Sequence, residues 1–241
     1  MRITLILGLL VGGIVLIFFV LLWLQPEWLL TRLRRRSPEV LYSVETEEPV
    51  VALTIDDGPD ANSSPMILDI LEEYQARATF FLITERIPGN EIVVQRMIAE
   101  GHELGNHLTE DEPSINLSPK EFELELLEAD EALSQFMDVQ WMRPGSGWYN
   151  EDMLNTMKKH GYQCALGSVY PYDPQLGFAW FSANYVLWKV KPGAVIVLHD
   201  YDTRGQRTAK ALEIILPELE QRGYHVVTLS ELTAVQSPID K

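Results

Sequence analysis

Apolar and polar positions follow two different patterns from residue 50 onwards. Short apolar runs rich in β-branched and aromatic residues are typical of strands, and they lie at 50–55, 78–83, 102–106, 139–143, 163–168, 194–199 and 225–229. The amphipathic segments between them predict helices at about 64–76, 91–100, 119–137, 151–160, 178–190 and 206–222. Alternation of strands and helices is typical of a parallel sheet covered by helices. About seven such units predict a distorted (β/α) barrel.

Two of the expected helices carry a clear start signal. Ser118 precedes Pro119, and Glu121 follows Ser118 by three residues; this is the pattern of a capping box with proline at the first helical position. Asn150 opens the next helix, and Gly161 follows that helix as a left-handed stop. These signals predict where the two helices begin.

The N-terminal segment differs in kind from the rest of the chain. Residues 3–24 are uncharged and apolar apart from one threonine and the glycines, and a helix of that length would span about 33 Å, enough for a bilayer core. No small-residue cleavage site follows, so the segment predicts an uncleaved transmembrane helix. The expected organisation is a membrane anchor with a basic flank (1–36), a linker (37–48), a large domain (49–233) and a tail (234–241).

The charges around this single-pass anchor and the inferred function predict opposite orientations. Arg2 precedes the apolar segment, whereas Arg32, Arg34, Arg35 and Arg36 follow it. The positive-inside rule would keep the large domain in the cytoplasm. An arginine cluster can also lie on anionic head groups, and the function inferred below favours an extracytoplasmic domain, which is our expectation.

Charge and cysteine content exclude several functions. The chain has 19 Lys and Arg against 35 Asp and Glu; residues 1–36 hold five arginines and one acid, which leaves 14 basic and 34 acidic side chains beyond them. So acidic a domain should repel nucleic acid and suits a neutral or cationic substrate. The single cysteine, Cys164, excludes an internal disulfide and a Cys-rich zinc site, and its apolar surroundings predict a core position.

Polar residues follow several of the expected strands. The run "TIDDGPD" places Asp56 and Asp57 side by side after the first strand, His107 follows the third, Arg143 ends the fourth and His199 ends the sixth. In barrels of this kind, active residues gather at the carboxyl ends of the strands. The paired aspartates have two interpretations from the residues alone, a turn or a cation site.

A metal site would explain why the chain accepts two adjacent carboxylates. A catalytic site for a divalent cation needs about three protein ligands and an open position. Asp57 can supply one ligand, and the stretch "GHELGNHLTED" can supply His107 and, four residues on, Asp111. Asp56 would then remain free as a base. Zinc is the expected cation, with manganese, cobalt or nickel as alternatives.

The motifs together resemble the polysaccharide deacetylase family, the NodB-homology carbohydrate esterases, over most of residues 49–232. The residues that carry the resemblance are "TIDDGPD" (54–60), "GHELGNHLTED" (101–111), "RPGSGWYN" (143–150), the looser "VYPYDP" (169–174) and "IVLHD" (196–200). Five motifs in the family's order are far more specific than any one of them.

The resemblance implies a role for each matching residue in the reaction. Asp56 would be the general base, Asp57 and His107 would be metal ligands, Arg143 would pair with Asp56, and His199 would be the general acid. The family's chemistry is the removal of acetyl groups from sugars, with a metal that polarises the carbonyl.

The resemblance also implies a substrate pocket. The backbone N–H of Ser146 would help to hold the oxyanion, Leu198 and Trp148 would line the acetyl pocket, and Asp173 would orient His199, with Asp200 as the second candidate.

The chain departs from the family pattern in two motifs. Asp111 stands where the second metal-binding histidine is usual, and Glu110 or Glu112 could serve instead. In the third motif, Gly145 replaces a proline and Ser146 an aromatic residue, which puts the shape of the substrate groove in question more than the chemistry.

The leading hypothesis is therefore a membrane-anchored, metal-dependent deacetylase of an N-acetylated amino-sugar polymer or glycoconjugate. The partners expected are that glycan and the lipid bilayer. The alternatives are a deformylase or acetyl-ester hydrolase on a lipid-linked sugar, and a glycan-binding relative without catalysis. Outside the site, His102 is expected to be structural, and the helical spacing of Trp180, Phe181, Tyr185 and Trp188 predicts core packing.

Overall fold

The computed structural model describes residues 12–13 and 24–235, and the chain divides into two compact units, Met1–Pro38 and Glu39–Lys241. The apolar segment 3–24 lies almost entirely outside the described residues. Within the described part of the chain, no helix has both the length and the apolar character needed to cross a bilayer. The basic flank forms helix α2 (Glu27–Arg36), whose last turn holds three of the arginines, where cations favour the helix dipole.

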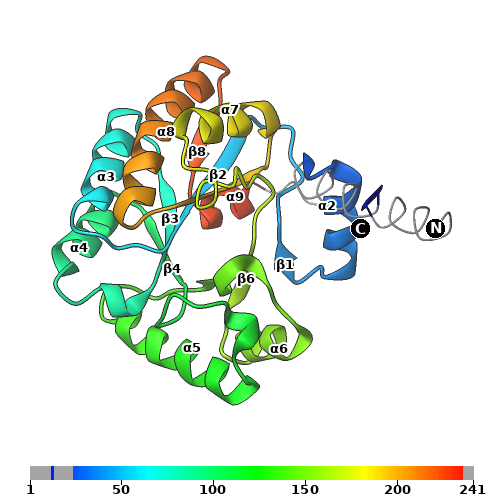
Figure 1. Ribbon diagram of the computed structural model, residues 1–241, viewed down its shortest axis with the longest axis vertical. Helices are drawn as coiled ribbons and strands as arrows, with labels where there is room; N and C mark the ends of the chain where they lie inside the picture. The colour runs from blue at the N-terminus through cyan, green and yellow to red at the C-terminus, as the bar shows by residue number, and fades with distance from the viewer. Residues whose placement is uncertain (1–11, 14–23, 236–241) are drawn as a thin grey trace, which may run out of the picture. The chain divides into compact units, whose positions relative to one another are not determined.

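The larger unit is built on one curled parallel sheet (Figure 1). Its strands are β1 (Val40–Leu41), β2 (Val50–Asp56), β3 (Ala78–Leu82), β4 (Glu103–Asn106), β5 (Trp141–Met142), β6 (Gln163–Ala165), β7 (Val195–His199) and β8 (His225–Val227). The strand order is β1-β6-β5-β4-β3-β2-β7, and β8 pairs with β2 at the start of that strand. The curl fits the distorted (β/α) barrel that the strand–helix alternation predicts. Strand β1, however, lies in the segment expected to be a linker.

Helices cover the outside of the sheet (Figure 1). They are α3 (Ser63–Glu73), α4 (Glu91–Ala99), α5 (Pro119–Ser134), α6 (Glu151–Lys159), α7 (Ala179–Lys189), α8 (Asp202–Gln221) and α9 (Leu229–Ala234). The Ser118 capping box and the Asn150 cap are both present. Helix α8 begins four residues earlier than expected, so residues 202–205 form its first turn.

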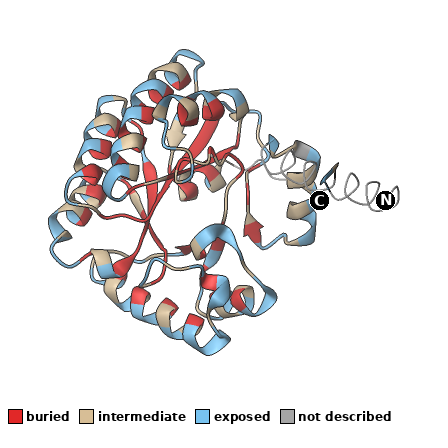
Figure 2. Ribbon diagram, in the orientation of Figure 1, coloured by how far each residue is buried: buried red, intermediate tan, exposed pale blue. Residues whose placement is uncertain are grey.

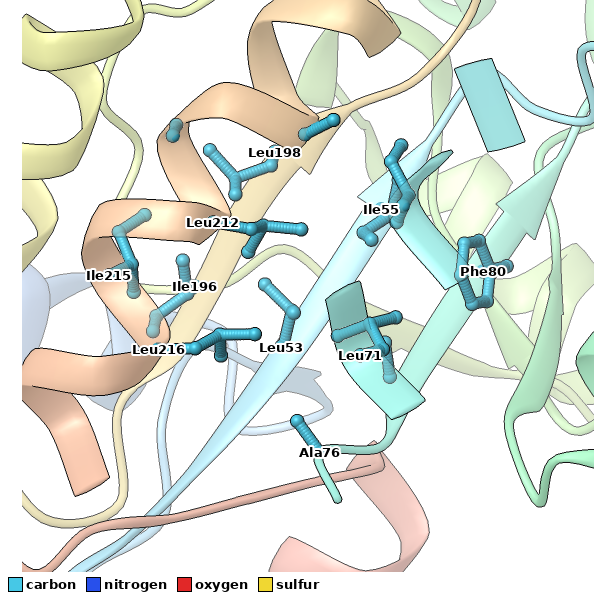
Figure 3. Close-up of a cluster of buried hydrophobic side chains, with 14 of the residues drawn as sticks. Leu53, Ile55, Leu71, Ala76, Phe80, Ile196, Leu198, Leu212, Ile215 and Leu216 are labelled. Atoms are coloured by element: carbon cyan, nitrogen blue, oxygen red, sulfur yellow. The ribbon is translucent and has the colours of Figure 1, made fainter. Parts of the chain in front are cut away.

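Alternate residues of each strand face two different environments, because strand side chains point to opposite faces in turn. Leu53 and Ile55 of β2 pack against Leu212 and Ile215 of α8 in the main core (Figure 3). Burial is concentrated on the strands and on the inner faces of the helices (Figure 2). This apolar layer between sheet and helices fixes the outer face of β2.

The opposite face of β2 carries the polar residues of the site. Thr54 and Asp56 lie on it, and both are buried. Asp56 is in register with His199 at the end of β7 and with Phe81 on β3. Three strands thus bring residues distant in the sequence to one end of the barrel.

Candidate active site

Asp56 and Arg143 form a buried ion pair. Arg143 Nη1 lies 2.5 Å from Asp56 Oδ1, and the two side chains are 3% and 4% exposed. The same Nη1 donates to Thr54 Oγ1 at 2.8 Å, and Nε donates to the Ala165 carbonyl at 2.8 Å. The guanidinium also stacks over the Phe81 ring, 4.2 Å from its centroid. These contacts hold the Asp56 carboxylate in one orientation at the strand end, as a catalytic base requires.

Asp57 turns away from the strand and meets His107. Its φ of 72° is left-handed, a conformation that aspartate tolerates better than most residues. The His107 Nδ1–H donates to the Arg143 carbonyl at 2.6 Å, so that Nε2 faces Asp57 Oδ1 at 3.5 Å. Burial favours the neutral carboxyl, but the hydrogen bond and charge of His107 outweigh it and hold the pKa of Asp57 well below its usual range.

His199 is held by Asp173, as the fourth motif implies. Its Nδ1 lies 3.1 Å from both carboxylate oxygens of Asp173, and its backbone N–H donates to Oδ2 at 3.0 Å. Burial lowers the pKa of His199, but the charge and hydrogen bond of Asp173 outweigh burial and raise the pKa to about 9. The imidazole is therefore protonated near neutral pH. Asp200, the second candidate, instead accepts hydrogen bonds from Ser63 and Ser64.

Asp111 does not join Asp57 and His107. Its Oδ2 accepts from Arg86 Nη2 at 2.7 Å and lies 3.5 Å from Arg204 Nη2, and its side chain is 46% exposed. Across the described ranges, 12–13 and 24–235, no group of three His, Cys, Asp or Glu side chains is arranged to hold a metal ion. The structure thus brings together two of the three expected ligands.

The third motif forms a tight loop beside the Asp56–Arg143 pair. Ser146 has a left-handed φ of 62° and is exposed, and Trp148 is 65% exposed, so its ring lies at the rim rather than in an enclosed pocket. A Cβ at Gly145 would lie 2.1 Å from the Glu112 carbonyl oxygen, and the Gly145 N–H donates to Ser114 Oγ at 2.7 Å. Proline, usual here in the family, could neither fit nor donate.

The expected role of Leu198 in the acetyl pocket is wrong. Leu198 is fully buried in the main core beside Leu212 of α8 (Figure 3). Because strand side chains alternate, it points to the face opposite His199. Val197, two residues before His199, shares the face of the imidazole and is the better candidate for that pocket.

The contacts of two arginines with Asp57 were not predicted from the sequence. Arg204 Nη1 lies 2.8 Å from Asp57 Oδ2, and Arg86 Nη1 donates to the Asp57 carbonyl at 2.6 Å. Arg204 lies in the first turn of α8, ahead of the helix start expected at residue 206. Arg86, at the end of a short 3₁₀ turn after β3 (Thr84–Arg86), gave no signal, because nothing in its local pattern marks its long-range partner.

Of the expectations for residues outside the site, some are confirmed and others are wrong. His102 is buried and its Nδ1 accepts from the Ala78 N–H at 3.2 Å, which confirms a structural role. Cys164 is buried, as expected, and burial raises the pKa of its thiol to about 12. Of the four aromatic residues expected in the core, Tyr185 is buried and Phe181 packs against the core, whereas Trp180 and Trp188 are 61% and 62% exposed.

Comparison with known proteins identifies the family. The polysaccharide deacetylase family model matches residues 43–165. A peptidoglycan-N-acetylglucosamine deacetylase of Bacillus cereus is 36% identical over 200 residues, covering 80% of this chain and 92% of the relative. The chain belongs to the polysaccharide deacetylase family. The resemblance read from the five motifs is thereby confirmed, and with it a carbohydrate deacetylase class of hydrolase.

Solved members of the polysaccharide deacetylase family share the fold. A peptidoglycan N-acetylglucosamine deacetylase crystallised with 4-naphthalen-1-yl-N-oxidanyl-benzamide aligns with a TM-score of 0.76 at 30% identity, covering 80% of this chain and 92% of that one. A family 4 acetyl xylan esterase from Clostridium thermocellum, solved with a cobalt ion, aligns with a TM-score of 0.71 at 30% identity, covering 77% and 91%.

The Asp57–His107 pair of this chain fits a divalent cation. Both side chains are buried, and the hydrogen bond from His107 Nδ1 to the Arg143 carbonyl leaves Nε2 facing a carboxylate oxygen, where the imidazole would present a lone pair to a cation once Nε2 has lost its proton. Such an outer partner is what fixes the tautomer of a metal-binding histidine. Nitrogen and carboxylate donors suit zinc and cobalt.

Proposed function

We propose that this protein removes N-acetyl groups from N-acetylglucosamine units of peptidoglycan or a related amino-sugar polymer, in a metal-dependent reaction. The observation that carries the proposal is that a carboxylate and an imidazole, each fixed by a charged partner, lie at the same end of the barrel. Asp56, paired with Arg143, is in register with His199, paired with Asp173. A carboxylate and a protonated imidazole on neighbouring strands supply a base and an acid to one bond.

The residues divide the work of amide hydrolysis. The Asp56 carboxylate removes a proton from the attacking water, and Arg143 keeps that carboxylate oriented. His199 donates its proton to the leaving nitrogen, since an amine is a poor leaving group unless it is protonated. The backbone N–H of Ser146 is placed on the loop beside the pair and would meet the oxyanion. Acetate and a free amino sugar are the products.

Asp57 and His107 would hold the metal. A bound divalent cation supplies Lewis-acid polarisation of the amide carbonyl. Zinc remains the first choice for this donor pair, with cobalt, manganese and nickel as alternatives. Arg143 contributes indirectly, because its carbonyl accepts from His107 Nδ1 and so presents Nε2 to the cation.

The side of the membrane on which the protein acts is proposed from the N-terminal segment and the substrate. The uncharged apolar run at 3–24 supports a single-pass anchor, and a wall polymer as substrate supports an extracytoplasmic domain, although the arginines after the run favour the opposite orientation. A topology reporter fused after Lys241 tests this placement. A cytoplasmic signal would exclude a wall polymer as substrate.

Acetate release tests the function directly. The full chain is stripped of metal, resupplied with zinc, cobalt, manganese or nickel, and incubated with peptidoglycan and with N-acetylglucosamine oligomers. We expect metal-dependent release that falls at least a hundredfold in D56N. D69N, which alters an exposed carboxylate on α3, is the matched control and should retain activity.

The same assay separates the alternative reactions. The solved acetyl xylan esterase relative favours an ester as the second substrate class. Release from acetylated xylan without release from amino-sugar amides would replace the proposed function by ester hydrolysis. No release from either, with glycan binding retained, would support a non-catalytic relative.

A further inference from the structure

Arg204 lies where a cation on Asp57 would compete with it. One oxygen of Asp57, Oδ1, faces His107 Nε2 at 3.5 Å, and the other, Oδ2, lies 2.8 Å from Arg204 Nη1. Asp57 is 6% exposed and Arg204 28%. A charge-assisted contact to so buried a carboxylate is strong. The carboxylate is thus shared between a histidine and a guanidinium.

Asp111 is the second acceptor of the same guanidinium. Arg204 Nη2 lies 3.5 Å from Asp111 Oδ2, which also accepts from Arg86 Nη2 at 2.7 Å. Arg86 is fixed from two further sides: Nη1 donates to the Asp57 carbonyl at 2.6 Å, and Cζ lies 3.7 Å from the centroid of the Tyr201 ring. Arg86 therefore holds Asp111 in reach of Arg204.

The first turn of α8 positions Arg204. A Cβ at Gly205 would lie 2.1 Å from Asp200 Oδ1 and 2.3 Å from Ser63 Oγ, so only glycine allows α8 to approach the start of α3 this closely. Asp200 accepts from Ser63 Oγ at 2.5 Å and from the Tyr201 N–H at 2.6 Å. These contacts hold the backbone that carries Arg204 against the start of α3.

A divalent cation and a guanidinium cannot share Asp57 without cost, because two positive charges a few ångströms apart repel. We propose that Arg204 is an internal cation that competes with the metal for Asp57, and that Asp111 accepts Arg204 when the metal displaces it instead of acting as the third ligand. This inference rests on the metal dependence in the proposed function. It accounts for the aspartate at 111: a carboxylate retains an arginine, and a histidine would not.

The competition between Arg204 and the metal for Asp57 is tested by measuring cobalt binding to the full chain with titration calorimetry. R204Q removes the charge and should tighten cobalt binding about tenfold or more. R204M, a second neutral variant, should do the same if R204Q folds poorly. R222Q is the control and should leave the affinity unchanged, because Arg222 follows the last residue of the same helix and contacts Glu218 and the Leu187 carbonyl. Equal or weaker binding in both neutral Arg204 variants would overturn the competition.

The role of Asp111 is tested by a double substitution. If Asp111 accepts Arg204, D111N should weaken cobalt binding in the wild-type background and have little effect in R204Q. If Asp111 is a ligand, D111N should weaken binding equally in both backgrounds, and that result would overturn this part of the inference. Because cobalt binding is the readout, a chain that binds cobalt as predicted but releases no acetate would contradict the proposed function alone.

Discussion

Removing Arg143 should destabilise the protein severely, because its partner cannot reach water. Asp56 and Arg143 are 4% and 3% exposed, with 2.5 Å between the charged atoms. Breaking a buried pair on one side costs about 3–5 kcal/mol, since the remaining charge is left uncompensated. The lost hydrogen bonds to Thr54 and Ala165 add about 1 kcal/mol or more each. For a domain of ordinary stability, about 5–15 kcal/mol, R143M should be marginally folded.

Urea denaturation followed by circular dichroism gives the free energy of unfolding, and a double-mutant cycle isolates the pair. We expect D56N to lose about 3–5 kcal/mol and R143M about 2 kcal/mol more, because R143M also removes the hydrogen bonds to Thr54 and Ala165. The double variant should lose at least about 2 kcal/mol less than the sum of the two, because neither charge is then left alone. R77M, which breaks the pair between the 48% exposed Arg77 side chain and Glu231, should cost less than about 1 kcal/mol. Additivity within about 0.5 kcal/mol would refute the argument.

Three further predictions concern separate groups. Burial, aided by two nearby arginines, lowers the pKa of His102 to about 4, so His102 contributes stability above pH 6.5 that is lost as the pH falls toward 4. Relative to H102Q, the wild-type free energy of unfolding should drop by about 3 kcal/mol across that window. A difference between the two proteins that does not change with pH would contradict this. Asp173 raises the pKa of His199 to about 9 against the effect of burial, so D173N should move the alkaline limb of acetate release to lower pH, and an unmoved limb would exclude the pairing as its cause. G145P should lower the melting temperature and reduce activity, because its ring would overlap the Glu112 carbonyl. Unchanged melting would show that the loop gives way.

The strand ends could be predicted from sequence because each depends on local pattern. Apolar runs rich in β-branched and aromatic residues placed β2, β3 and β7 within a residue or two, and the Ser118 capping box placed α5. Strand β1 was missed because its two residues are too few for a pattern. Its stability comes from pairing with β6 across more than a hundred residues.

The side of the sheet to which Leu198 points could also have been predicted from the sequence. Neighbouring residues of a strand point to opposite sides, so a strand that directs His199 into the barrel directs Leu198 into the layer of helices. The exposure of Trp180 and Trp188 could not have been predicted from the sequence. Helical spacing shows that such residues share a face, and only the packing of α7 decides whether that face is covered.

The sequence by itself determined the family, the polar residues at the strand ends and the Asp56–Arg143, Asp57–His107 and His199–Asp173 pairings, because each follows from a motif in a fixed order. Only the tertiary structure decided where Asp111 lies. Its loop packs on Gly145, and two arginines from distant elements, Arg86 and Arg204, hold its carboxylate. Charge pairing acts through space, so a partner more than ninety residues away leaves no mark on the local pattern that places a strand or a helix.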